Sequence, residues 1–125
     1  MKNLAIAVIA SLVVIAATGC AATRGYDGPP RSREQVAVIT GIDDAGITVL
    51  VRKVDGKVVQ NFRKASSEIE VLPGRHEIET SCWMKGIRGS EGIKNSIDAQ
   101  AGADYQILIV VMDGKCSTSI INKQK

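Results

Sequence analysis

From residue 35 onward, short segments rich in Val, Ile and Thr alternate with turn sequences, and this alternation favours a fold built of strands. Asp55-Gly56 and Asp113-Gly114 predict two-residue hairpin turns, because glycine accepts the positive φ that such turns require. Pro73-Gly74 predicts a third turn. No long pattern of 3.6-residue period is present, so the fold class is predicted to be all-β. The expected strands cover residues 35–40, 46–54, 57–63, 68–72, 75–83, 93–99, 105–112 and 115–122, and the glycine-rich stretch 84–92 is expected to be the longest interior loop.

Alternation within the segments indicates which side chains face the core. Ile47, Val49 and Val51 share one face of their segment. Residues 105–112 are apolar on both faces, which is typical of a strand buried on both sides. We therefore expect this segment to be the central strand.

The N-terminal stretch has the layout of an export signal. Lys2 precedes an apolar run from Leu4 to Ala17 that only Ser11 interrupts. As a helix this run would span about 21 Å, which is short of the roughly 30 Å hydrocarbon core that a transmembrane helix crosses. A permanent membrane-spanning helix is therefore not expected.

The apolar run ends in Ala17-Thr18-Gly19-Cys20, which resembles the lipobox of bacterial lipoproteins. The resemblance implies a signal peptide over residues 1–19, and a diacylglycerol and an N-acyl chain such as palmitate on Cys20. Several acyl chains anchor a protein durably, because each buried methylene adds roughly 0.8 kcal/mol. Ala21 stands where an Asp often marks retention at the inner membrane, which implies the periplasmic face of the outer membrane. The alternative is an ordinary secretory signal cleaved near this point, with Cys20 incidental.

Composition indicates a single domain behind a spacer. Residues 20–34 are rich in Gly, Pro, Arg and Ser, and Gly28-Pro29-Pro30 favours an extended backbone, so we expect a flexible linker there and one domain over residues 35–125. The chain has 16 basic and 13 acidic residues and no basic cluster. It has few aromatic side chains on which bases could stack. Nucleic acid is therefore not an expected partner.

The cysteines predict one disulfide. If Cys20 carries lipid, Cys82 and Cys116 remain as a pair in an oxidising compartment, where disulfides persist. Cys82 lies in phase with Ile78 along its strand, and Cys116 lies in phase with Ile120, so both sulfurs point inward if both isoleucines do. Two separate buried thiols are the alternative. A metal site is not expected, because two cysteines and one distant histidine supply too few ligands.

Two turn motifs suggest a family. Tyr26-Asp27-Gly28-Pro29 and Leu72-Pro73-Gly74-Arg75-His76 resemble stretches found in small proteobacterial lipoproteins. The second motif, with Val54-Asp55-Gly56-Lys57 upstream, is also similar to the hairpins of PEGA-type β-domains. The Pro-Glu-Gly-Ala tetrapeptide itself is absent. The resemblance implies a small antiparallel β-sandwich that serves as an envelope or interaction module, with no catalytic residues to carry over.

Candidate functional residues are few. His76 is the only histidine, and no serine or cysteine nucleophile is expected beside it together with an orienting acid, so nucleophilic catalysis is not expected. Glu77 and Glu79 share the solvent side of a strand, where two glutamates are usually only solvated. Trp83 either packs against the disulfide or forms a partner patch. In the second case the patch consists of Trp83, Met84, Lys85 and Arg88.

Taken together, these features predict a lipoprotein that is anchored in the membrane through Cys20 and binds an envelope protein or peptidoglycan. No enzymatic activity and no cofactor besides the covalent lipid are expected. The alternative function is a small cell-wall hydrolase or ligand-binding lipoprotein.

Overall fold

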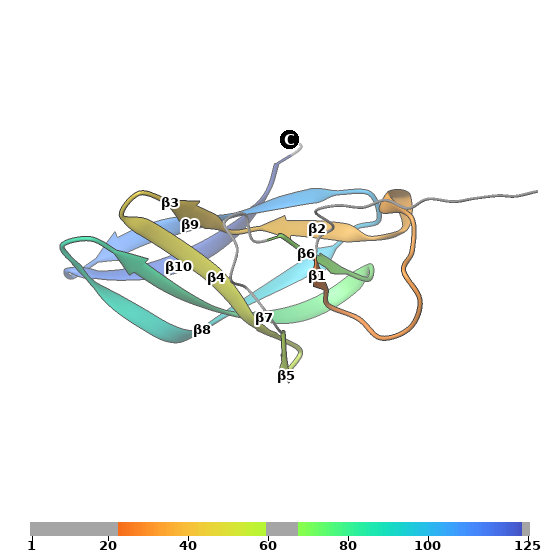
Figure 1. The fold of residues 1–125 in the computed structure, drawn as a ribbon, viewed down its shortest axis with the longest axis horizontal. Helices are drawn as coiled ribbons and strands as arrows, with labels where there is room; N and C mark the ends of the chain where they lie inside the picture. The colour runs from red at the N-terminus through yellow and green to blue at the C-terminus, as the bar shows by residue number, and fades with distance from the viewer. Residues whose placement is uncertain (1–22, 60–67, 124–125) are drawn as a thin grey trace, which may run out of the picture.

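The computed structural model describes residues 23–59 and 68–123. The predictions for residues 1–19, for Cys20 and for residues 60–63 of the expected strand 57–63 lie outside this part of the chain. The described residues form ten strands and one short 3-10 helix, without an α-helix, which confirms the all-β prediction (Figure 1). No helix within the two described ranges is long and apolar enough to cross a membrane. The elements are β1 (Thr23–Arg24), η1 (Arg33–Gln35), β2 (Ala37–Thr40), β3 (Ile42–Asp44), β4 (Ile47–Val54), β5 (Lys57–Val58), β6 (Glu68–Val71), β7 (Gly74–Met84), β8 (Ile87–Ala99), β9 (Asp104–Met112) and β10 (Lys115–Asn122).

The strands form one curled sheet in the order β1-β6-β2-β9-β10-β8-β7-β4-β3, with β5 paired to β4. The prediction of a purely antiparallel arrangement is wrong, because β1 pairs with β6, β2 with β9 and β10 with β8 in parallel. These three pairs join strands that no tight turn connects. A hairpin can form only antiparallel pairs, so the turn signals carried no information about them.

Two of the predicted hairpin turns are confirmed. Asp55 and Gly56 have φ values of 51° and 83°, and Asp113 and Gly114 have 53° and 73°. Positive φ at both central residues is the requirement of a type I′ turn, which matches the twist of the flanking strands. Pro73-Gly74 also forms a bend, but it does not close a hairpin, because β6 pairs with β1 and β2 whereas β7 pairs with β4 and β8.

The stretch 84–92 is not the predicted loop. β7 and β8 continue through it and are joined by a two-residue turn at Lys85-Gly86, with irregular register near Cys82. Gly86 takes positive φ in the turn, whereas Gly89 and Gly92 lie within β8, Gly92 also at positive φ. The prediction failed because it assigned all three glycines to a loop, although only one of them is in the turn.

Alternating side chains from both halves of the sheet fill the core. Val49 and Val51 are fully buried, as their alternation predicted, whereas Ile47 at the start of β4 is half-buried. The main buried apolar residues are Val36, Ala37, Val38, Ile39, Val49, Val51, Val54, Ile69, Val71, Ile78, Ile97, Ala99, Ala103, Tyr105 and Ile107.

β9 is central in the strand order but is not buried on both faces. Tyr105 and Ile107 face the core, while Leu108, Val110 and Met112 on the outer face are 39%, 37% and 59% exposed. The apolar character of both faces was correctly recognised. The expected burial does not follow, because no second layer covers the outer face within the described residues.

Part of the predicted linker belongs to the sheet. Thr23 and Arg24 form β1, parallel to Ile69 and Glu70 of β6. The Gly25 backbone N–H continues this pairing by donating to the Glu70 carbonyl oxygen, 2.7 Å away. The described chain is therefore fixed to the domain from its first strand onward.

Candidate interaction surface at the hairpin end

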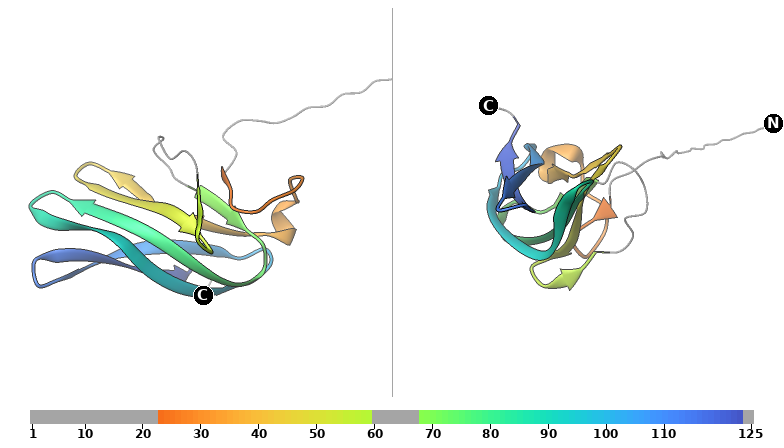
Figure 2. Two further views of the ribbon diagram at one scale, coloured as in Figure 1. Left: turned by 90° about the horizontal axis from the view of Figure 1, so that it is seen from below. Right: turned by 90° about the vertical axis from the view of Figure 1, so that its left-hand side faces the viewer.

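Three turns meet at one end of the curled sheet (Figure 2, left). They join β3 to β4, β7 to β8 and β9 to β10. The Lys85 N–H donates to the Gly46 carbonyl at 2.8 Å, and the Arg88 N–H donates to the Gly114 carbonyl at 3.0 Å, so the turns are tied to one another. We call this region, with residues 82–88 of the β7–β8 hairpin and 111–116 of the β9–β10 hairpin, the hairpin end. β1 lies away from it, towards the other end of the sheet.

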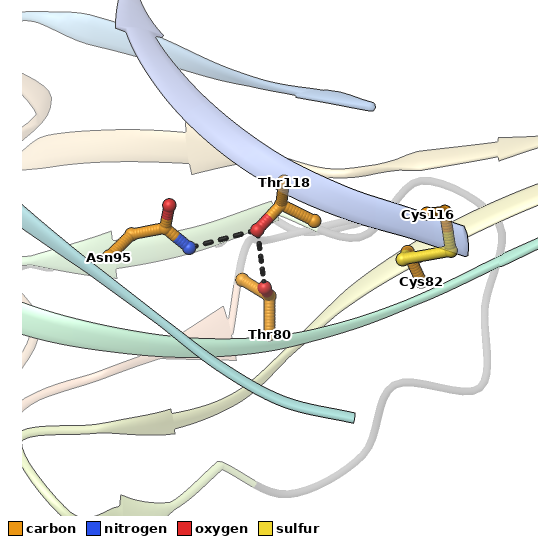
Figure 3. The surroundings of a disulfide bond; sticks show 5 residues. All are labelled: Thr80, Cys82, Asn95, Cys116 and Thr118. Atoms are coloured by element: carbon orange, nitrogen blue, oxygen red, sulfur yellow. Dashed lines mark hydrogen bonds between the residues drawn. A yellow bond between two sulfur atoms is a disulfide. The ribbon is translucent and has the colours of Figure 1, made fainter. Parts of the chain in front are cut away.

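Cys82 and Cys116 form a disulfide beneath this surface, with Cα atoms 6.3 Å apart (Figure 3). Both cysteines are buried, at 5% and 1% exposure, as their phase along β7 and β10 predicted. The predicted bridge thus joins two strands that face each other across the core. Two separate thiols, the alternative interpretation, are not what the structure contains.

A buried polar cluster repeats this connection one step further along the same strands. The hydroxyl oxygens of Thr80 and Thr118 lie 2.7 Å apart, and Asn95 Nδ2 donates to Thr118 Oγ1 at 2.9 Å (Figure 3). Thr80 is fully buried and Thr118 nearly so. Since a buried hydroxyl is costly without a partner, this cluster fixes the spacing of β7, β8 and β10.

Trp83 points away from the disulfide. Successive residues of a strand face opposite sides, and Trp83 is 52% exposed whereas Cys82 is buried. The indole lies beside Gly89, where an added Cβ would meet Trp83 Cδ1 at 3.6 Å. Of the two interpretations of Trp83, the structure therefore favours an exposed side chain over one packed on the bridge.

The other predicted patch residues divide between the two faces of the hairpin. Lys85 in the turn and Arg88 in β8 are exposed, whereas Met84 is half-buried and shares the inward phase of Cys82. The structure brings Trp83, Lys85 and Arg88 to one surface and leaves Met84 beneath it.

Cross-strand register extends this surface beyond the predicted residues. Arg88 of β8 is the partner of Lys115 in β10, and Lys115 is the partner of Met112 in β9. Because directly opposed residues share a face, Met112, Lys115 and Arg88 form one row across the outside of the hairpin end. Trp83 of β7, whose indole lies beside Gly89 of β8, continues this row. We call these four residues the outer row. Alternation could have placed Met112 and Lys115 on a hairpin, but the β8–β10 pairing that joins them to Arg88 has no local sequence signal.

The outer row combines two exposed cations with two exposed apolar side chains. Met112 is 59% exposed and Trp83 is 52% exposed, and they lie at the two ends of the row. Exposed large apolar residues next to arginine are typical of protein interfaces. The row could therefore contact a partner that offers apolar side chains with carboxylate or phosphate groups between them.

His76 is engaged elsewhere in the sheet. Its Nδ1 lies 2.6 Å from Asp55 Oδ2, and its Nε2 lies 2.7 Å from the Leu72 carbonyl oxygen. Both neighbours are acceptors, so the protonated ring can donate to both. Glu77 and Asp98 are exposed rather than gathered around the ring. The contacts thus tie the β4–β5 turn to the start of β7, and no nucleophile joins them among the hydrogen bonds of His76.

The pKa of Asp55 is lowered in this cluster. Burial by itself would raise the pKa of Asp55, but the Glu77 backbone N–H, which donates to Oδ1 at 2.9 Å, and the His76 ring together hold that pKa below its ordinary value. A depressed pKa is expected for a carboxylate stabilised by hydrogen bonds in its charged form. The charge of Asp55 therefore supports the turn.

No group of three or more His, Cys, Asp or Glu side chains gathers in a metal-binding arrangement within residues 23–59 and 68–123. Comparison of the chain with protein-family models, curated proteins and solved structures found no match. The similarity to small lipoproteins and to PEGA-type domains therefore stays a prediction from the turn motifs.

Proposed function

We propose that the protein is a non-enzymatic lipoprotein, anchored through Cys20 at the periplasmic face of the outer membrane, that binds another envelope component with its hairpin end. The observation that carries the binding role is the outer row, in which Trp83 and Met112 are exposed beside Arg88 and Lys115. We further propose that the two halves of the curled sheet act as the layers of a small sandwich that supports this surface.

The disulfide supports export to an oxidising compartment. Disulfides persist outside the cytoplasm and are rare where thiols are kept reduced. Cys82 and Cys116 are bonded and buried, while the third cysteine, Cys20, follows the apolar run at the position of the lipidated residue in a lipobox. This division of the three cysteines is the one that an exported lipoprotein needs.

The position of the hairpin end supports binding at a distance from the membrane. The described chain begins at β1, which lies away from the three turns (Figure 2, left). An anchor on the N-terminal side of Thr23 would leave the outer row free to meet a partner. The partner expected from the charge pattern is an envelope protein or a peptidoglycan-bound component that presents acidic groups beside apolar ones.

Membrane anchoring is tested by Cys20→Ser. We expect the variant to leave the membrane fraction and to lose metabolic fatty-acid labelling, because the thioether to glycerolipid cannot form on serine. A variant that still sediments with membranes would contradict the anchor. If the signal is instead cleaved at an ordinary secretory site, the wild-type protein will not incorporate the fatty-acid label.

The binding role is tested by in-cell photo-crosslinking from the Trp83 position. We expect a discrete crosslinked species that is lost when Arg88→Glu and Lys115→Glu are combined, because both cations of the outer row are reversed. Ser96, which is exposed on the outside of β8 away from the turns, is the matched crosslinker position. Equal crosslinking from Trp83 and Ser96, or crosslinking that survives the charge reversal, would overturn the proposal.

A further inference from the structure

β9 has an incompletely paired backbone edge. β10 covers one side of β9 along its whole length, from Tyr105 to Met112. On the other side β2 pairs with residues 104–106, and that pairing ends at Gln106 because the chain leaves β2 at Gly41 and enters β3, which pairs with β4. In a parallel ladder the last pair, Thr40 with Gln106, directs the Ile107 N–H to Thr40, and among the described strands none is paired with this side of β9 beyond that N–H.

The hydrogen bonds between β2 and the start of β9 show which way the unpaired backbone groups of β9 point. The Val38 N–H donates to the Ala103 carbonyl at 3.0 Å, so Ala103 points toward β2. Alternate residues of a strand share an edge, so the backbone groups of Ile107, Ile109 and Val111 point the same way. Gln106 Nε2 donates to the carbonyls of both Thr40 and Ile107 at 3.1 Å, which marks the place where β2 ends and the open edge begins.

This edge lacks the features that usually keep a strand edge from pairing. Natural edges carry lysine, proline, a bulge or an inward charge. Residues 107–112 read Ile-Leu-Ile-Val-Val-Met and contain no charge and no proline, and no register shift interrupts the β9–β10 ladder. The open edge is therefore suited to accept another strand.

We propose that β9 pairs in an antiparallel manner with β9 of a second copy of this chain, about a twofold axis at Ile109. Ile109 then opposes its own copy, Ile107 opposes Val111, and Leu108 opposes Val110. Ile109 and its copy then exchange both backbone hydrogen bonds. Each Val111 N–H donates to the Ile107 carbonyl oxygen of the other copy, which has a second lone pair beside its contact with Gln106.

Charge and shape favour a second copy over other occupants. Every opposed pair is apolar, so self-pairing brings no like charges together. The exposed side chains of Leu108 and Val110, at 39% and 37%, become cross-strand neighbours on one continuous outer face. A strand from an unrelated protein would need a comparable uncharged segment, whereas the second copy supplies it in the correct register.

The test uses light scattering to measure the particle mass of the full chain, as the cell processes it, in non-ionic detergent. Wild type is expected to show two chains per particle, decreasing to one on dilution. Val110→Lys should raise the dissociation constant at least about tenfold, because the two lysines lie diagonally across the pair. Adding Leu108→Asp should restore association, because each introduced carboxylate then opposes a lysine of the other copy. Ser96→Lys, on the outside of β8, is the matched control and should associate as wild type does.

Amide exchange gives a readout that needs no variant. The amides of Ile109 and Val111 should exchange at least about tenfold more slowly when wild type is concentrated, because pairing covers them. The proposal is overturned if wild type has one chain per particle at all concentrations, if Val110→Lys associates like wild type, or if the double variant fails to recover. The proposal is also overturned if the purified chain is monomeric and these amides are protected only when a different protein is added.

Discussion

Breaking the Cys82–Cys116 disulfide should cost a large part of the domain's stability. The bridge closes a loop with a sequence separation of 34 residues. In the chain-entropy description, a cross-link of this length removes about 12.6 cal/mol/K of entropy from the unfolded chain, which corresponds to roughly 4 kcal/mol at 25 °C. Small domains have a total free energy of unfolding of only about 5–15 kcal/mol, so the reduced protein should be marginally stable.

The assay is urea unfolding followed by circular dichroism, on oxidised wild type, reduced wild type and the double variant Cys82→Ala/Cys116→Ala. Reduced wild type keeps both buried sulfurs, so its loss of unfolding free energy measures the cross-link alone. The double variant should lose about 1–2 kcal/mol more, because both positions are buried and lose packing. If reduction lowers the free energy of unfolding by less than about 1 kcal/mol, the entropic reasoning is refuted.

Three further changes test other contacts. Thr118→Val should cost about 1–3 kcal/mol in urea unfolding, because the Asn95 amide loses its buried acceptor, whereas a valine on the exposed side of the same strand should cost little. Asp55→Asn should remove the part of the wild type's loss of stability at acid pH that comes from protonation of Asp55. The folded-state pKa of Asp55 is depressed, so its contribution is present above its ordinary pKa and is lost as pH falls through the lower folded value, and the effect should stay below about 1 kcal/mol because the carboxylate is half exposed. Gly89→Ala should destabilise by about 1 kcal/mol and shift the Trp83 fluorescence, because the new Cβ would lie 3.0 Å from a β7 carbonyl oxygen; unchanged fluorescence and stability would contradict this packing.

Local rules explain what the sequence could predict. The Asp-Gly turns and the alternation of Val49 with Val51 depend on residues next to each other, and the structure confirms them. The disulfide followed from phase along two strands, which is also a local property. The same alternation places Trp83 opposite Cys82, so the sequence already contained the reason why the indole does not pack on the bridge.

Long-range pairing explains what the sequence could not predict. The parallel neighbours β2 and β9 have no turn between them, and a single pair, Lys115 with Arg88, joins β10 to β8. The outer row depends on that junction, so an argument from neighbouring residues could not predict half of the candidate site. The open edge of β9 has the same origin, because it exists only where the chain leaves β2 for β3.

The β8–β10 junction also explains why the bridge lies where it does. Hydrogen bonding between the two halves of the sheet is thin at this point, and the disulfide and the Thr80–Thr118 contact join β7 to β10 directly across the core. Trp83 belongs to one half and Met112 to the other, so the outer row keeps its geometry only while the halves are held together. If the proposed partner binds at the outer row, we expect binding to require the bridge, and therefore an oxidising compartment in which the bridge persists.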